Sequence, residues 1–174
     1  MKTLFAAIAI FSSTAMLADA QCELCAANAN AGQECVLTQT LSDYFTLQKA
    51  LANDDFAAAK KAVGALNASQ ENMACAVEGK DCCAELKSAT TTLSSAETIE
   101  SARQSFKALS NVLIAQLEAS GSSGDSPIYK MHCPMAFGNT GGTWLQDSDD
   151  LRNPYYGAMM LKCGMPQAVI GKKE

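Results

Sequence analysis

The sequence of 174 residues has little basic charge, few aromatic residues, one histidine and one tryptophan. Its 13 Lys and Arg residues are outnumbered by 18 Asp and Glu residues, which gives a formal net charge of −5. Nucleic-acid binding draws most of its affinity from cationic side chains on phosphates, so the composition argues against a nucleic-acid partner. The chain also lacks paired carboxylates, a Ser/His/Asp order and a Gly-rich phosphate loop. We therefore predict that it is not an enzyme.

Long apolar runs are missing as well, although a short one stands at the N-terminus. Residues 4–11 are apolar, follow Lys2 and precede Ala18-Asp19-Ala20. A basic residue, a short apolar run and a small-residue A-x-A site are typical of a secretory signal peptide. A retained membrane anchor is the alternative, but a span needs about 20 apolar residues. We predict a signal peptide over residues 1–20, cleaved after Ala20, and a periplasmic or secreted protein with no membrane span in the mature chain.

What the sequence does contain is a helical pattern over residues 37–119. Apolar residues from Leu37 to Leu51 recur at i, i+4, i+7 and i+8, which predicts a first helix. Residues 53–55 can cap a second helix, and a weaker third starts near Asp81. An S-x-x-E capping box over residues 94–97 is expected to open the fourth. Four amphipathic helices with short connections predict an all-α, antiparallel bundle.

The remaining segments differ from the bundle in composition. Residues 21–36 contain three cysteines and no helical stripe, so we expect a tail or an ordered loop there. Residues 120–126 are rich in Gly and Ser, which predicts a linker. Residues 127–166 hold all four prolines and many large apolar residues. We expect an irregular segment packed on the bundle, with a helical turn near 157–162 and a C-terminal tail over 167–174.

Two short arms of residues 127–166 concentrate soft donor atoms. The first holds His132, Cys133 and Met135, and the second holds Met160 and Cys163. Thiolate and thioether ligands are soft and favour Cu(I) over Mg²⁺ or Ca²⁺. The i, i+2 spacing of Cys133 and Met135 puts both sulfurs on one side of an extended backbone, and Met160 and Cys163 share one face of a helical turn. We predict a sulfur site for Cu(I), or for Ag(I), with His132 as an additional candidate ligand.

Each candidate has a plainer alternative. In an exported protein, Cys133 and Cys163 could form an ordinary disulfide instead of sharing a metal. Met159 and Met160 could fill gaps in the core, as methionines often do. The thioether beside each cysteine favours the metal, because a disulfide needs no such neighbour.

The quoted motifs resemble a known family. The C-terminal part reads YKMHCPMAF…WLQ…LRNPYYGAMMLKCG, and the helices before it include ALANDDFAAAKKAVGALNAS and ESARQSFKALSNVLIAQLEA. These stretches, over about residues 37–165, resemble an exported heavy-metal-binding domain family, a domain of unknown function that also forms the C-terminus of periplasmic adaptor subunits of copper/silver RND efflux pumps. The resemblance implies Cys133, Met135, Met160 and Cys163 as metal ligands. It also implies an efflux adaptor or a copper chaperone as a partner.

Six further cysteines lie outside that signature. Cys22-x-x-Cys25 could be a thioredoxin-like motif, a second metal clip or part of a local disulfide. It lacks βαβ surroundings, so redox catalysis is the least favoured of these. The others are Cys35, Cys75, Cys82 and Cys83, and the sequence does not fix their pairing.

Together these patterns predict a periplasmic heavy-metal-binding protein for sequestration or transfer to an efflux system. The alternatives are a disulfide-stapled helical module that binds a protein partner without metal, and a thiol oxidoreductase that uses Cys22 and Cys25.

Overall fold

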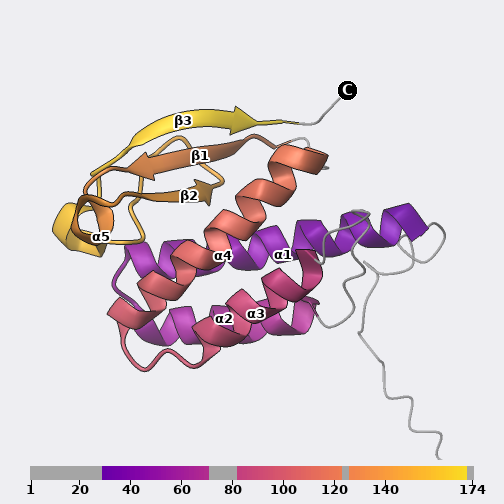
Figure 1. The fold of residues 1–174 in the computed structure, drawn as a ribbon, viewed down its shortest axis with the longest axis horizontal. Helices are drawn as coiled ribbons and strands as arrows, with labels where there is room; N and C mark the ends of the chain where they lie inside the picture. Colours follow the sequence, from indigo (N-terminus) through magenta and orange to yellow (C-terminus); the bar gives the residue numbers. More distant parts are fainter. Residues whose placement is uncertain (1–28, 71–81, 123–125, 172–174) are drawn as a thin grey trace, which may run out of the picture.

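The computed structural model describes residues 29–70, 82–122 and 126–171. Four helices come first: α1 (Ala29–Ala52), α2 (Phe56–Gln70), α3 (Cys82–Ser94) and α4 (Ile99–Ser120). They are followed by β1 (Ile128–Cys133), the short helix α5 (Ala136–Asn139), β2 (Gly142–Gln146), the 3-10 helix η1 (Gly157–Met160) and β3 (Met165–Ile170). Figure 1 shows the three strands lying across one side of the helical bundle, with β3 outermost.

The predicted bundle is confirmed. Successive helices pack against one another, α1 on α2, α2 on α3 and α3 on α4. The apolar stripe of α4 is fully buried at Phe106, Leu109 and Leu113. The Phe106 ring stacks on Tyr44 of α1, with centroids 5.0 Å apart, so the core runs from the first helix to the last.

Of the two predicted helix caps, one is confirmed and the other is wrong. Asp55 caps α2, because its Oδ1 accepts a hydrogen bond from the Ala58 N–H at 2.9 Å. The box over residues 94–97 is wrong, since Ser94 is the last residue of α3. The reciprocal pair four residues later forms the box instead: Ser101 N–H donates to Thr98 Oγ1, and Thr98 N–H donates to Ser101 Oγ, both at 3.2 Å.

The expectation of an all-α protein with an irregular C-terminal segment is wrong. Residues 128–170 form an antiparallel sheet of order β2-β1-β3. A bulge between Lys130 and Met131 breaks the alternation of β1, and β3 carries Pro166 on an edge strand, where a missing N–H is tolerated. β2 packs against α4 and α1, so the protein is mostly helical with one small sheet.

Element boundaries also differ from those expected. α1 begins at Ala29, inside the expected tail 21–36. β3 crosses the expected boundary between residues 166 and 167. Ser122 N–H donates to the Gly171 carbonyl at 3.2 Å, which ties the chain after α4 to the end of β3. The helical turn predicted near 157–162 is confirmed by η1.

A buried arginine fastens the loop before η1 to the bundle. Arg103 of α4 donates to the Pro154 carbonyl and to the Leu51 carbonyl, each at 2.9 Å, and to Asp54 Oδ1 at 2.5 Å. Asp54 Oδ2 in turn accepts from the Ala158 N–H at 2.8 Å. Gly157 passes so close, with φ +60°, that a Cβ there would lie 2.0 Å from Asp54 Oδ1, so no other residue fits without displacing Asp54.

The Asp54 carboxylate should make the stability of the fold pH-dependent. The Ala158 N–H and then the Arg103 guanidinium lower the pKa of Asp54. Its contribution is therefore complete above the unfolded pKa and is lost as the pH falls through the lower folded pKa. Because the side chain is 43% exposed, we expect Asp54→Asn to cost at most about 1 kcal/mol at pH 7. Urea titrations of both proteins at pH 7 and pH 3 check this; an equal difference at both pH values would contradict it.

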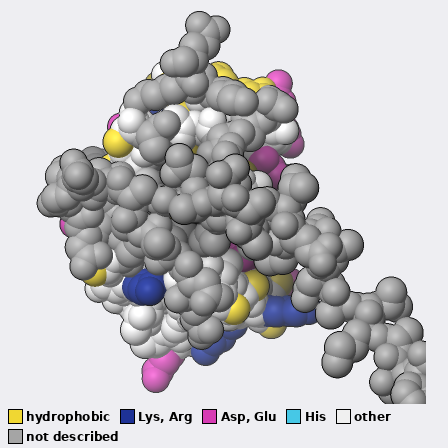
Figure 2. Space-filling view, turned by 90° about the vertical axis from the view of Figure 1, so that its right-hand side faces the viewer, with side chains coloured by type: hydrophobic (Ala, Val, Ile, Leu, Met, Phe, Trp, Pro, Cys, Tyr) yellow, Lys and Arg dark blue, Asp and Glu magenta, His cyan; other side chains and the backbone are white. Residues whose placement is uncertain are grey.

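Figure 2 shows both basic and acidic side chains on the face seen there, among patches of hydrophobic atoms. Within residues 29–70, 82–122 and 126–171, no helix is long and apolar enough to cross a bilayer. The predicted signal peptide, residues 1–20, lies outside the described residues.

Candidate metal centre

Three sulfur atoms meet where β1 ends and β3 is about to begin. Cys133 Sγ lies 3.3 Å from Cys163 Sγ, and Cys163 Sγ lies 3.8 Å from Met135 Sδ. Cys133 and Cys163 are both free thiols. The structure thus brings together three of the five predicted site residues, from the two arms on which they were predicted.

The three sulfurs differ in their access to solvent. Cys133 is the last residue of β1 and is fully buried. Cys163 is half-buried, and Met135 is 45% exposed. Met135 lies at the start of α5 with helical backbone angles, so the chain leaves the strand after Cys133 and the predicted extended Cys133-x-Met135 geometry is wrong. The sulfurs still form a graded series from the core to the surface.

The close thiol pair affects the proton affinity of the site. The hydrogen bond shared with Cys133 raises the pKa of the Cys163 thiol, and burial adds to this effect. Two neighbouring thiolates would also repel each other. Cys163 therefore gives up its proton less readily than an isolated cysteine.

A buried asparagine positions the second arm. Asn153 is fully buried, and its Nδ2 donates to the Cys163 carbonyl at 2.7 Å. Its Oδ1 accepts from the Tyr155 N–H at 2.8 Å. Its main chain receives a bond from Gly157 N–H and donates one to the Leu161 carbonyl, at 3.1 and 2.8 Å. Asn153 thus closes the loop that delivers Cys163 to Cys133.

Aromatic side chains connect this loop to the first arm. The Tyr156 hydroxyl donates to the Met135 carbonyl, and the Tyr155 hydroxyl donates to the Thr143 carbonyl, each at 2.6 Å. Tyr155 packs edge-on against Trp144, with centroids 5.6 Å apart. Burial raises the pKa of Tyr155, so its hydroxyl stays neutral and keeps donating. We call the rings of Trp144, Tyr155 and Tyr156 the aromatic cover of this loop.

The turn after Cys163 passes tightly over the sheet. Gly164 has φ +145°, and a Cβ there would lie 2.9 Å from the His132 carbonyl oxygen and 3.0 Å from Trp144 Cη2. Any larger residue would lift the Cys163 arm off the sheet. Gly164 and Asn153 are positioning residues that periodicity and spacing could not reveal.

The other two predicted ligands, Met160 and His132, are not part of the hydrogen-bonded sulfur cluster of the described residues. Met160 ends η1, and its carbonyl accepts from the Cys163 N–H at 2.9 Å, so the helical turn reaches Cys163. In the described part of the chain no hydrogen bond joins the Met160 sulfur to the other three. His132 precedes Cys133 on β1 and therefore faces the other side of the strand, where its Nδ1 lies 3.1 Å from Thr143 Oγ1.

For the remaining six cysteines, no side chain is among those that the structure describes. Cys22, Cys25 and Cys75 lie outside the described residues, and for Cys35, Cys82 and Cys83 only the backbone is described. Among the described side chains, no group of three or more His, Cys, Asp or Glu residues could hold a metal. The third donor beside Cys133 and Cys163 is a thioether, which restricts the candidate site to soft metals.

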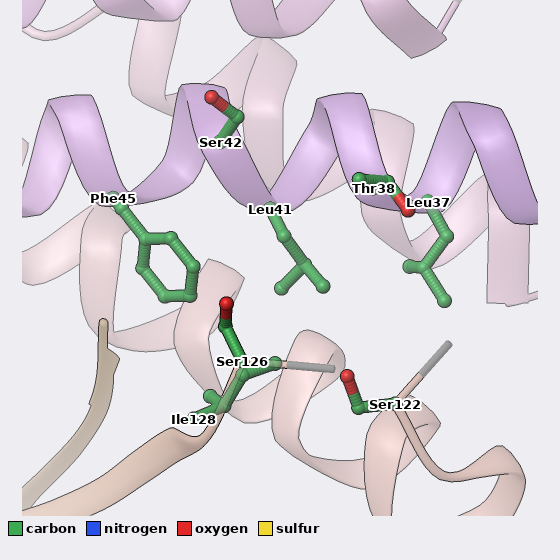
Figure 3. Close-up of a pocket in the computed structure, with 8 residues that line it drawn as sticks. All are labelled: Leu37, Thr38, Leu41, Ser42, Phe45, Ser122, Ser126 and Ile128. Atoms are coloured by element: carbon green, nitrogen blue, oxygen red, sulfur yellow. The ribbon is translucent and has the colours of Figure 1, made fainter. Parts of the chain in front are cut away.

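An apolar pocket lies elsewhere, between α1 and the start of β1. Its volume is about 230 Å³. Figure 3 shows Leu41 and Phe45 directed towards Ser126 and Ile128, and Leu37 on the side of Ser122. Among its described lining residues are serine hydroxyls and no titratable side chain. It opens at the other end of β1 from the sulfurs, so it contributes nothing to their chemistry.

The fold and the site define a four-helix bundle with a small antiparallel sheet that carries a thiol–thioether cluster. Residues 40–125 match the sequence model of a family described as a protein of unknown function, DUF3347. This match, just under half of the chain, covers most of the bundle and ends before β1. No curated protein and no solved structure matches the chain. The sulfur cluster therefore has to be interpreted from its own geometry.

Proposed function

We propose that the protein binds a soft monovalent metal ion, Cu(I) or Ag(I), through Cys133, Cys163 and Met135, and sequesters it or passes it to an efflux system. The observation that carries the proposal is the convergence of three sulfurs at 3.3 and 3.8 Å. Met160 and His132 are additional ligands only if their side chains turn towards the ion.

The donor set supports Cu(I) more than Zn²⁺. Structural zinc is held by four tetrahedral ligands drawn from Cys, His and carboxylates. Here two cysteines and one thioether converge, and thioethers are soft donors suited to Cu(I). A cation between Cys133 and Cys163 would also offset the repulsion between their thiolates. Because the thiols must lose protons to bind, affinity should fall as the pH falls.

The gradient of exposure supports transfer rather than permanent burial of the ion. Met135 and Cys163 are accessible from outside, whereas Cys133 is buried. A partner's sulfur ligands could replace Met135 first and Cys163 next, while Cys133 still holds the ion. We propose an efflux adaptor or a copper chaperone as that partner and the periplasm as the compartment, in line with the N-terminal pattern of residues 1–20.

Anaerobic titration of the reduced full-length protein against a chromogenic Cu(I) chelator tests the proposal. We expect the protein to withdraw one Cu(I) per chain from the chelator at this site and to prefer Cu(I) to Zn²⁺. A reduced protein that leaves all Cu(I) with the chelator, or that takes Zn²⁺ more tightly, would contradict it.

Replacing Met135 with leucine is expected to weaken Cu(I) binding about tenfold, because leucine keeps the volume and removes the sulfur. Met159→Leu is the matched control: Met159 is 82% exposed and no described contact links it to the thiols. The same chelator titration on both variants, with unfolding curves to show that stability is retained, checks this. Equal losses in the two variants would exclude Met135 as a ligand.

A further inference from the structure

The two thiols of the cluster are close enough to react with each other. Their Sγ atoms are 3.3 Å apart, and a disulfide bond is about 2.05 Å long, so the sulfurs need to approach by about 1.2 Å. Cys163 is half-buried, and Cys133 is fully buried. The pair thus consists of one thiol that a small molecule can reach and one that it cannot.

We propose that Cys133 and Cys163 form a thiol–disulfide exchange site for low-molecular-weight disulfides, in which Cys163 reacts first and Cys133 completes the exchange. The resulting Cys133–Cys163 disulfide removes both thiolate ligands, so oxidation releases the metal. The release of metal on oxidation rests on the proposed function, whereas the exchange chemistry does not.

The exchange takes place in two balanced steps. The Cys163 thiolate attacks one sulfur of a disulfide R–S–S–R, forming a Cys163–S–S–R mixed disulfide and releasing R–S⁻. The Cys133 thiolate then attacks Cys163 Sγ, forming the Cys133–Cys163 bond and releasing a second R–S⁻. The two protein thiols lose two protons and two electrons, and the small disulfide is reduced to two thiols. A small thiol reverses the sequence.

The backbone around each sulfur supports a local reaction. Cys133 is paired with Gly142 in the sheet, and Asn153 holds the Cys163 carbonyl. Both arms are therefore held by contacts that do not involve the thiols. Met135, the third donor, is a thioether and cannot form the bond.

Digestion with trypsin shows directly whether the Cys133–Cys163 disulfide has formed. Cleavage after Lys130, Arg152, Lys162 and Lys172 separates peptide 131–152, whose one cysteine is Cys133, from peptide 163–172, whose one cysteine is Cys163. The reduced full-length protein is treated with oxidised glutathione, alkylated, digested and analysed by mass spectrometry. We expect the two peptides to become cross-linked and to separate again after reduction, and we expect Cu(I) affinity to fall at least about 100-fold on oxidation and to recover.

Variants test the order of reaction. Cys133→Ala should accumulate one glutathione on Cys163, because no second thiol can displace it. Cys163→Ser should leave Cys133 unmodified, since the buried thiol is out of reach. Modification of Cys133 in that variant would overturn the proposed order.

The cross-linking assay contains no metal, so its result separates this proposal from the metal site. If the cross-linked peptides do not form, the proposed exchange site is wrong. The proposal that the reduced protein binds Cu(I) is not affected by that result. Full Cu(I) binding by the cross-linked protein would overturn metal release. Failure of the reduced protein to bind Cu(I), with cross-linking preserved, would overturn only the proposed function and the metal release that depends on it.

Discussion

A variant in which serine replaces both Cys133 and Cys163 is expected to bind Cu(I) at least about 100-fold more weakly than the reduced native protein. The substitution removes two of the three converging sulfurs and replaces them with hydroxyls, which are hard donors and stay protonated at neutral pH. Anaerobic chelator competition measures the loss. Far-UV circular dichroism and a urea titration show whether the bundle is retained.

The matched control for that variant replaces Cys22 and Cys25 with serine. These residues form the other cysteine pair that the sequence offers as a metal clip. We expect this control to keep the affinity of the native protein. The opposite result would be loss of tight Cu(I) binding in this control and native affinity in the variant that lacks Cys133 and Cys163. That result would mean that the ion is held elsewhere in the chain.

The helices could be predicted from the sequence because burial alone determines their pattern. Leu37, Leu41 and Tyr44 recur on one face of α1 and all lie in the core. The sheet could not be predicted in this way, because its strands lack the alternation of a half-buried strand. The bulge shifts the register of β1. In β2, Trp144, Leu145 and Gln146 are buried in succession, and the Gln146 side chain is satisfied by the Ser148 and Asp150 carbonyls.

The sequence predicted which kinds of donor atom form the candidate site, but not how all of them are placed. Soft residue types pointed to Cys133, Met135 and Cys163, which the structure brings together. The same argument does not distinguish them from Met160 and His132, because spacing cannot reveal where a loop turns or which face of a strand a side chain takes. Asn153 was missed for a related reason: it binds main-chain atoms, which leave no pattern in the sequence.

Replacing Asn153 with alanine is expected to lower the free energy of unfolding by about 2–4 kcal/mol, because the Cys163 carbonyl and the Tyr155 N–H lose their partner. A urea titration measures this loss. Asn67→Ala is the matched control, since half-buried Asn67 donates to Ser94 Oγ at 2.8 Å in a solvent-exposed hydrogen bond. Removing such a bond should cost under about 0.5 kcal/mol. Equal losses in the two variants would contradict the role of Asn153.

Stability alone does not distinguish a positioning residue from an ordinary buried one, so the Asn153 variants also need a readout at the sulfurs. We expect Asn153→Ala to bind Cu(I) about 10- to 100-fold more weakly under conditions where it is still folded, and to form the Cys133–Cys163 disulfide more slowly. Asn153→Asp keeps the acceptor for the Tyr155 N–H but faces the Cys163 carbonyl with an oxygen instead of a donor. It should therefore lose Cu(I) affinity as Asn153→Ala does. Native affinity in Asn153→Asp would mean that the bond to the Cys163 carbonyl does not position the thiol, and that the arm is held by Gly164 and the aromatic cover instead.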